Sequence, residues 1–198
     1  HQSYVVYVYG SETVRLGQRA FIAKLMRRVL LNSQRVISNS DSTTQEFEAF
    51  GIPKAKIKRI YPGVDTHSFC PAAKDPALVQ QLGLADKTVV LTVARLDQRK
   101  GHDLVMRALA YLGDRTQDIL YLIVGKGREE QRLRGLAAEL GLKDRIVFVG
   151  YIPDEDLPRY YNLCDLFVMP NRITEGTALS GDIEGFGISF IEANACGK

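Results

Sequence analysis

The 198-residue sequence is poor in cysteine and has no long apolar run. Its three cysteines, Cys70, Cys164 and Cys196, stand far apart, and none forms a C-x-x-C pair or has a neighbouring histidine as a metal ligand. A scattered, odd set of this kind argues against a disulfide framework and against a zinc site, and it favours a reducing, cytosolic setting. No segment approaches the roughly 20 apolar residues that span a bilayer, and no signal peptide is visible. We therefore expect a cytoplasmic protein.

The sequence also lacks a strong charge of either sign. Lys and Arg number 26 against 23 Asp and Glu, a formal charge of +3, which is too small to predict nucleic-acid binding. The small excess would suit an anionic small ligand or peripheral contact with an acidic membrane surface, but a solvated surface of mixed charge explains it equally well. The hydrophobic fraction of 45% and the charged fraction of 25% are those of a globular protein with a sizeable core, so disorder is excluded.

The first third of the chain alternates short strands with helices. The expected elements are strands at 5–9, 35–38 and 58–61 and helices at 19–31 and 42–50. Ser42 is the expected cap of the second helix. Prolines and glycine then cluster between Pro62 and Pro76, and these residues interrupt regular structure. We expect a domain boundary there, which divides the chain into residues 1–64 and 65–198.

Beyond the boundary, a strand is followed by a helix four times. The expected strands are 88–94, 120–124, 145–149 and 166–169, and the expected helices are 102–112, 129–140, 154–162 and one from about 187. Continuous apolar strands that alternate with helices are typical of an α/β fold with a parallel, doubly wound sheet covered on both faces. Ligands of such sheets bind beyond the carboxyl ends of the strands, close to helix N-termini. The informative loops are therefore 94–101, 125–128, 150–154 and 170–187.

Two of these loops together predict an anion site. Arg95 and Lys100 could neutralise a diphosphate, although a solvated basic loop is the simpler explanation of that loop alone. Gly185 and Gly187 would let the backbone approach a ligand, and the free N–H groups at the following helix start would attract an anion. Glu192, about one turn into that helix, could accept hydrogen bonds from ribose hydroxyls. An ordinary tight turn and an exposed helix residue are the alternatives for this second loop.

Several segments follow one another in the order and spacing of a known family: Arg95…Lys100-Gly101, Val124-Gly125-Lys126-Gly127 and Glu184-Gly185-Phe186-Gly187…Glu192-Ala193. They resemble the family-4 retaining glycosyltransferases of the GT-B fold, whose E-x7-E signature Glu184 and Glu192 match. Tyr61-Pro62-Gly63-Val64-Asp65 resembles the interdomain linker of that family, and Ser38-Asn39-Ser40 before Thr43 and Phe47 resembles its last acceptor-domain strand and helix. The resemblance covers nearly the whole chain. Within the family, the loop 172–187 is most similar to that of the bacterial phosphatidylinositol-mannoside mannosyltransferases.

The resemblance implies a GT-B fold in which residues 65–198 form a Rossmann-like donor domain and residues 1–64 a remnant of a second Rossmann-like, acceptor-binding domain. It implies a chain truncated at both ends that transfers sugar poorly by itself. The implied activity is metal-independent, retaining transfer of mannose, glucose or a similar hexose from a GDP- or UDP-sugar to an acceptor hydroxyl. The acceptor would be a sugar, a lipid or a small molecule, and no cofactor is implied.

The family's functional residues can be placed on this sequence by number. Arg95 and Lys100 would bind the donor diphosphate, Glu184 would lie against the transferred sugar, and Glu192 would hold the ribose. The remaining donor-binding residues would be Gly125, Gly127, Tyr151, Ile152, Gly185, Phe186, Gly187 and Ile188, with Tyr151 and Ile152 at the base. One motif departs from the family, because many members have His-Gly-x-Glu where this chain has Tyr9-Gly10-Ser11-Glu12. Whether Tyr9 replaces that histidine, which contacts the donor sugar, stays open.

Some motifs could also indicate functions other than transfer. Asp154-Glu155-Asp156 resembles a metal-binding D-x-D, but it follows Pro153 and precedes a helix, so helix capping explains it better. Gly125-Lys126-Gly127 lacks the third glycine of a dinucleotide fingerprint, since position 130 is Glu130, and a hydride-transfer enzyme is disfavoured. A non-catalytic nucleotide-sugar-binding module and a sugar-nucleotide epimerase on the same fold stay as alternatives. The basic helix 19–35 could contact anionic lipid, or it could simply pack on its own sheet.

Overall fold

The computed structural model describes residues 3–8, 20–172 and 186–198. These residues form two compact units, each with its own parallel sheet. The first unit runs to Gly63 and includes Phe186 and Gly187, and the second comprises Val64–Arg172 and Ile188–Lys198. Parallel sheets flanked by helices confirm the predicted α/β class.

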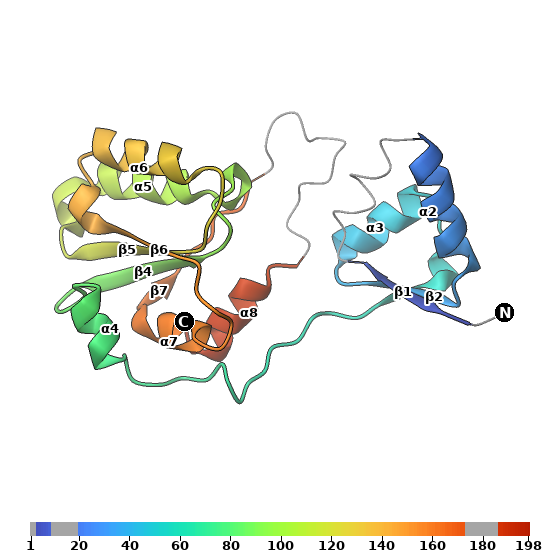
Figure 1. Cartoon of the computed structure of the whole chain (residues 1–198), viewed down its shortest axis with the longest axis horizontal. Coiled ribbons are helices and arrows are strands. Elements are labelled where there is room, and N and C mark those ends of the chain that lie inside the picture. The colour runs from blue at the N-terminus through green and yellow to red at the C-terminus, as the bar shows by residue number, and fades with distance from the viewer. Residues whose placement is uncertain (1–2, 9–19, 173–185) are drawn as a thin grey trace. The chain divides into compact units, whose positions relative to one another are not determined.

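The second unit has four parallel strands in the order β6-β5-β4-β7. The strands are β4 (Thr88–Val93), β5 (Ile119–Val124), β6 (Ile146–Gly150) and β7 (Leu166–Phe167). Helices α5 (His102–Leu112) and α6 (Glu130–Glu139) cover one face of this sheet, and α4 (Pro76–Gln81), α7 (Leu157–Leu163) and α8 (Ile188–Ala195) cover the other (Figure 1). Short 3-10 turns lie at Gln98–Lys100, Gly113–Thr116 and Lys143–Arg145.

Alternate residues of the central strands supply two separate cores. Val89, Leu91 and Val93 of β4 pack in a cluster with residues of α4, α7 and α8. Val90, between them, packs on the opposite face with residues of α5 and α6. Burial on both faces explains why these strands are continuous apolar runs. Because β5 and β6 lie on one side of β4 and β7 on the other, the strand order reverses beside β4, where doubly wound sheets place their ligands.

The first unit has the parallel strand order β1-β2-β3, with β1 (Val5–Val8), β2 (Arg35–Ser38) and β3 (Ile57–Arg59). Its helices are α2 (Ala20–Asn32) and α3 (Asp41–Ala49), with a 3-10 turn at Lys54–Lys56. The core of this unit is small and consists of Leu30, Val36, Phe47 and Ile52. The Lys56 ammonium group donates to the carbonyl oxygens of Leu31, at 2.6 Å, and of Ser33. A cation at these carbonyls satisfies acceptors that the end of α2 leaves unpaired.

Two predicted helix starts are wrong. The N-cap of α3 is Ser40, not Ser42: its backbone is extended (φ −156°, ψ 169°) and its hydroxyl accepts from the Thr43 N–H at 3.1 Å. Helix α7 begins at Leu157, three residues later than expected, and Pro158 occupies the first turn, where proline is tolerated because that N–H has no helical partner. Asp156 makes no side-chain capping bond there and instead accepts from Arg159 at 3.0 Å.

An additional helix that was not predicted, α4, begins at Pro76, where the proposed boundary region ends. Pro76 is its first residue, and the Asp75 carboxylate accepts from the N–H groups of Ala77 (2.9 Å) and Leu78 (3.2 Å). An aspartate cap followed by proline is a helix start signal. A prediction that treats the proline cluster only as an interruption of regular structure overlooks this signal.

Candidate functional site

A cleft of about 280 Å³ opens at the carboxyl edge of the sheet in the second unit. Its walls come from the ends of β4 and β5, the segment after β6 and the start of α8. Six of the predicted donor-site residues line it: Arg95, Gly125, Tyr151, Ile152, Ile188 and Glu192. Asp154 and Ser189, which the sequence analysis did not assign to the site, line it as well. One guanidinium, the first residues of a helix and two carboxylates therefore share a single cleft.

The other predicted site residues lie elsewhere or outside the described ranges. Lys100 ends the 3-10 turn after Arg95 and is only 8% exposed, and it is not part of the cleft lining. Phe186 and Gly187 group with the first unit, where the Phe186 ring lies 5.7 Å from the ring of Tyr61. Gly187 has φ +80°, a conformation that glycine adopts without strain immediately before α8. Glu184, Gly185 and Tyr9 fall outside the residues that the structure describes.

Gly125 and Gly127 bring two loops of the cleft wall into close contact. Gly125 has φ +135°, and a Cβ atom there would lie 2.0 Å from the carbonyl oxygen of Ala94. A Cβ atom on Gly127 would lie 2.3 Å from the carbonyl oxygen of Leu96. The Leu96 N–H donates to the carbonyl of Lys126 at 3.0 Å, which joins the loops through their backbones. Packing against the Arg95 loop is thus a sufficient reason for glycine at position 127.

A buried polar network fixes the backbone of Arg95. His102, only 1% exposed, places its Nε2 3.3 Å from the Arg95 carbonyl oxygen and its Nδ1 3.1 Å from the Tyr121 hydroxyl. The Tyr121 hydroxyl shares a 2.8 Å hydrogen bond with Thr92 of β4. Burial lowers the pKa of His102, so the ring is neutral near pH 7. The network ties Arg95, two residues after β4, to β5 and to the start of α5.

The loop that carries Arg95 and Lys100 also contacts residues 170–172. The Arg172 N–H donates to the carbonyl of Arg99 at 2.9 Å, and its guanidinium donates to the Asp103 carboxylate at 3.0 Å. A Cβ atom on Gly101 would lie 2.1 Å from the Pro170 carbonyl oxygen, so only glycine permits this approach. The turn that carries Lys100 is thus held against residues 170–172, where the predicted ligand-binding loop 170–187 begins.

Glu192 is held at the cleft by Tyr161. The Tyr161 hydroxyl donates to Oε2 of the half-buried Glu192 carboxylate at 2.6 Å. Burial raises the pKa of Glu192, the nearby Asp154 adds to this effect, and the hydrogen bond from Tyr161 opposes it. The alternative of an exposed Glu192 is therefore wrong. Tyr161 could not be predicted as a site residue, because nothing in an apolar helix pattern distinguishes a tyrosine that packs in the core from one whose hydroxyl reaches a site.

The lining of the cleft suits a ligand that carries both anionic groups and hydroxyls. The Arg95 guanidinium and the N–H groups at the start of α8 can bind an anion, while Glu192 and Asp154 can accept hydrogen bonds from hydroxyls. Asp154 lines the cleft but Asp156 pairs with Arg159, so the two aspartates of the D-x-D have different surroundings. Throughout the described ranges, no three His, Cys, Asp or Glu side chains gather as a metal-binding group.

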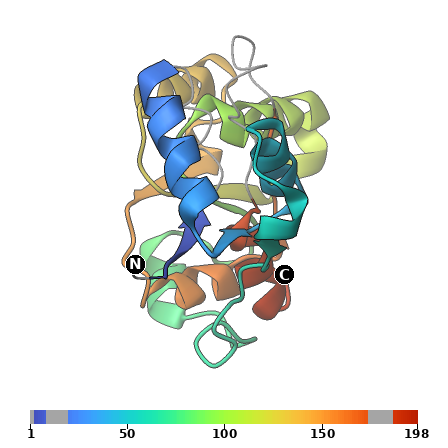
Figure 2. The same ribbon diagram turned by 90° about the vertical axis from the view of Figure 1, so that its right-hand side faces the viewer.

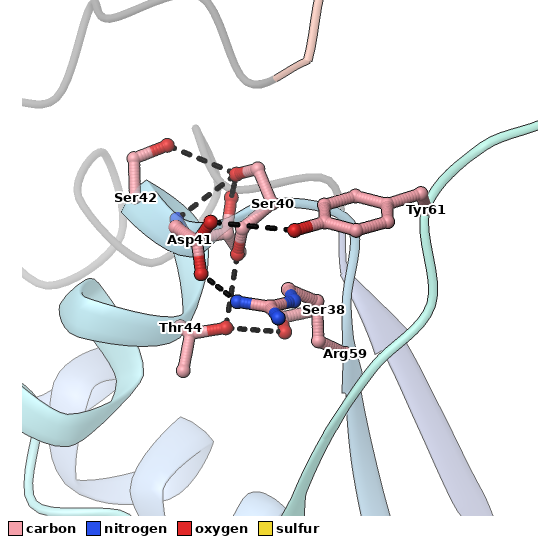
Figure 3. Close-up of polar contacts among 8 residues, drawn as sticks. Ser38, Ser40, Asp41, Ser42, Thr44, Arg59 and Tyr61 are labelled. Atoms are coloured by element: carbon pink, nitrogen blue, oxygen red, sulfur yellow. Dashed lines mark hydrogen bonds and ion pairs between the residues drawn. The ribbon is translucent and has the colours of Figure 1, made fainter.

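A second polar cluster lies at the carboxyl ends of β2 and β3 in the first unit (Figure 3). The Asp41 carboxylate pairs with the Arg59 guanidinium and accepts from the Tyr61 hydroxyl at 3.3 Å, and Arg59 also lies 5.0 Å from the centre of the Tyr61 ring. Ser38 and Thr44 share a hydrogen bond of 2.7 Å. The contacts within this cluster hold the first residues of the linker against the start of α3.

With this geometry in place, comparison with known proteins identifies the class as glycosyltransferases. Residues 75–198 match the family described as "Glycosyl transferases group 1", and residues 1–68 match the family described as "Glycosyltransferase Family 4". The first match covers more than half of the chain, and the chain belongs to the group 1 glycosyl transferases. The predicted family resemblance is confirmed.

Curated relatives include mannosyltransferases. The chain is 40% identical over 174 residues to the GDP-mannose-dependent α-(1-6)-phosphatidylinositol monomannoside mannosyltransferase of Mycolicibacterium smegmatis, which covers 87% of this chain and 44% of that protein. It is 36% identical over 160 residues to the mannosylfructose-phosphate synthase of Agrobacterium fabrum, covering 76% of this chain and 33% of that protein. The chain thus spans less than half the length of these relatives.

Solved structures show the same GT-B fold. The Anabaena protein HepE, in a complex with UDP and glucose, aligns with a TM-score of 0.78 at 26% identity over 100% of this chain and 52% of its own. Sucrose-phosphate synthase of Thermosynechococcus elongatus aligns with a TM-score of 0.74 at 28% identity over 99% and 49%. Among the helices that the structure describes, none combines the length and apolarity needed to cross a bilayer.

Proposed function

We propose that this protein is a retaining, metal-independent hexosyltransferase that moves mannose from GDP-mannose to an acceptor hydroxyl. The observation that carries the proposal is the meeting of Arg95, the start of α8 and Glu192 in one cleft at the strand-order reversal. This site suits a nucleoside diphosphate attached to a sugar, because it offers groups for both phosphates and hydroxyls. Mannose and guanine are proposed because the relative at 40% identity is named as GDP-mannose-dependent.

In the proposed reaction, the acceptor oxygen attacks C1 of the mannose on the face from which the diphosphate departs. The bond between C1 and the phosphate oxygen breaks with its electron pair on the GDP, and the hydroxyl proton passes to that oxygen. Arg95 and the N–H groups of α8 would stabilise the negative charge that develops on the diphosphate, with Lys100 of the same loop assisting. Glu192 would hold the ribose, Tyr151 and Ile152 the base, and Glu184 the sugar. For catalysis, these groups must stabilise the charge that develops in the transition state more than they stabilise the bound substrate.

A binding assay followed by a transfer assay tests this proposal. Titration calorimetry should detect binding of GDP-mannose to the protein, with a higher affinity than that of UDP-glucose. With radiolabelled GDP-mannose and sugar or inositol-lipid acceptors, label should enter the acceptor as GDP is released. Binding without transfer to any acceptor would favour the non-catalytic module that the Tyr9 departure permits, and a changed sugar without acceptor would favour an epimerase. Absence of binding to either donor would overturn the proposed donor site.

We also propose that the outer face of α2 contacts an anionic membrane surface. Phe21 is 81% exposed, Leu25 55% and Val29 43%. Lys24 and Arg28 line a shallow hollow of about 700 Å³ together with Phe21 and Leu25. This helix is coloured blue in Figure 2. Apolar side chains bordered by cations match the acyl chains and phosphates of an acidic bilayer surface.

Vesicle sedimentation tests this contact. The protein should sediment with phosphatidylglycerol vesicles and much less with phosphatidylcholine vesicles, and 0.5 M salt should weaken the binding because the charge attraction is screened, with a Debye length of only several Å. Leu25→Glu should reduce binding by roughly tenfold, since it puts a negative charge at the centre of the face. Tyr111→Glu is the matched control, because Tyr111 is exposed on α5 of the other unit. Equal binding by both variants, or self-association through α2 in place of vesicle binding, would contradict the proposal.

A further inference from the structure

Tyr161 joins the core of the second unit to the cleft. Its side chain is fully buried on α7, and its ring centre lies 5.8 Å from that of Phe69 and 5.8 Å from that of Phe167. Its hydroxyl donates a hydrogen bond to Oε2 of Glu192 at 2.6 Å. The ring is therefore fixed on both sides, and the position of its hydroxyl is fixed with it.

This arrangement gives the two oxygens of the Glu192 carboxylate different surroundings. Oε2 is engaged by a donor whose position the core determines, which leaves Oε1 as the oxygen oriented for a ligand. A glutamate on a helix surface has three rotatable side-chain torsions, and holding one oxygen removes most of that freedom before the ligand arrives. Preorganised groups of this kind bind more tightly because less entropy is lost on binding.

We propose that Tyr161 is a positioning residue for the donor: it holds one oxygen of Glu192 so that the other accepts hydrogen bonds from ligand hydroxyls. The inference rests on the proposed function and assigns to that site a residue that contacts no ligand itself. It gives Tyr161 a role separate from packing, because the hydroxyl can be removed while the ring stays.

The role has a signature in the pH dependence of binding. The titratable and charged groups around Glu192 are Asp154 and Tyr151 after β6, Arg95 after β4, Tyr161 on α7 and Cys196 directly after α8. The Tyr161 hydrogen bond favours the ionised carboxylate, whereas burial and Asp154 favour the protonated one. Without the hydroxyl, the pKa of Glu192 should rise further. Donor affinity should then be lost at a higher pH, since only the ionised carboxylate accepts at both oxygens.

The test is Tyr161→Phe, with Tyr160→Phe as the matched control. Tyr160 is the adjacent, buried tyrosine on α7, and it is outside the cleft lining. GDP-mannose is the probe, because both of its phosphates stay ionised between about pH 5 and 8, so its own titration does not enter. We expect Tyr161→Phe to weaken binding roughly tenfold at pH 7.5 and to shift the loss of binding to higher pH, and Tyr160→Phe to do neither.

Two further measurements separate positioning from a general loss of structure. In a Glu192→Gln background, Tyr161→Phe should have little additional effect, because the carboxylate that it acts through is absent. Carboxyl-carbon NMR titration of the ligand-free protein should give a higher Glu192 pKa in Tyr161→Phe than in the unchanged chain. An equal loss of affinity in both backgrounds, or an unchanged Glu192 pKa, would overturn the inference. These results are distinct from failure of the proposed function, in which the unchanged chain would bind no sugar nucleotide while the NMR shift persisted.

Discussion

Arg95→Ala is expected to weaken GDP-mannose binding by about 10- to 150-fold, the effect of losing hydrogen bonds worth about 1.5–3 kcal/mol to a charged group. Arg95 is a cationic residue of the cleft lining, and its carbonyl is held by His102, so the loop that carries it is fixed before a ligand binds. A guanidinium can donate to two phosphate oxygens at once, and the N–H groups of α8 alone cannot replace it. Calorimetry should show a weaker salt dependence in the variant, because one ionic contact is lost.

Arg107→Ala provides the control for this experiment. Arg107 is exposed on α5, outside the cleft lining, and its removal changes the net charge of the chain equally. It should leave the dissociation constant within about twofold, because a distant exposed charge is screened by salt. The double variant Arg95→Ala/Lys100→Ala should bind no measurable donor. If Arg95→Ala bound donor like the unchanged chain, the diphosphate would have to bind elsewhere.

Gly127→Ala is expected to lower the free energy of unfolding by about 3 kcal/mol, the upper part of the range for overpacked sites. The added methyl group would lie 2.3 Å from the carbonyl oxygen of Leu96 and 2.7 Å from both its carbonyl carbon and its nitrogen. These are backbone atoms, and the Leu96 N–H is already bonded to the Lys126 carbonyl, so no side-chain rotation can make room. Urea unfolding followed by circular dichroism should show a lower midpoint with an unchanged slope.

Gly135→Ala is the matched substitution that should act in the opposite direction. Gly135 is exposed within α6, and a Cβ atom there would meet no atom within 4 Å. Alanine inside a helix is more stable than glycine by about 0.5–1 kcal/mol, so the midpoint should rise. If both variants shifted the midpoint in the same direction, the close approach of the loops at Gly127 would not be a determinant of stability. Because the displaced loop carries Arg95, Gly127→Ala should also weaken donor binding.

The strands and most helices of the second unit could be predicted because their burial determines their sequence. The expected strand at 88–94 is β4 at Thr88–Val93, and the expected helix at 102–112 is α5. Helix starts were predicted less well, because several serines and aspartates next to one another can each cap, and only the backbone conformation selects one. Ser40, and not Ser42, is the N-cap of α3, because the backbone of Ser40 is extended.

The site could be predicted where a topological rule applies and not where side chains meet in three dimensions. Arg95, Gly125 and Glu192 share a cleft because all three follow the carboxyl ends of strands in one parallel sheet. Tyr161 acts through its hydroxyl and His102 through its two ring nitrogens, both on buried side chains, and no spacing in the sequence indicates such contacts. The buried position of Lys100 depends on the 3-10 turn that carries it, which the loop sequence did not indicate.

A crystal structure of the protein with GDP would show directly whether Arg95 and the start of α8 bind one diphosphate. We expect phosphate oxygens within hydrogen-bonding distance of the Arg95 guanidinium and of the N–H groups at Ile188 and Ser189, with the ribose hydroxyls at Glu192. A diphosphate bound away from Arg95, or at Arg95 but remote from the start of α8, would contradict this expectation.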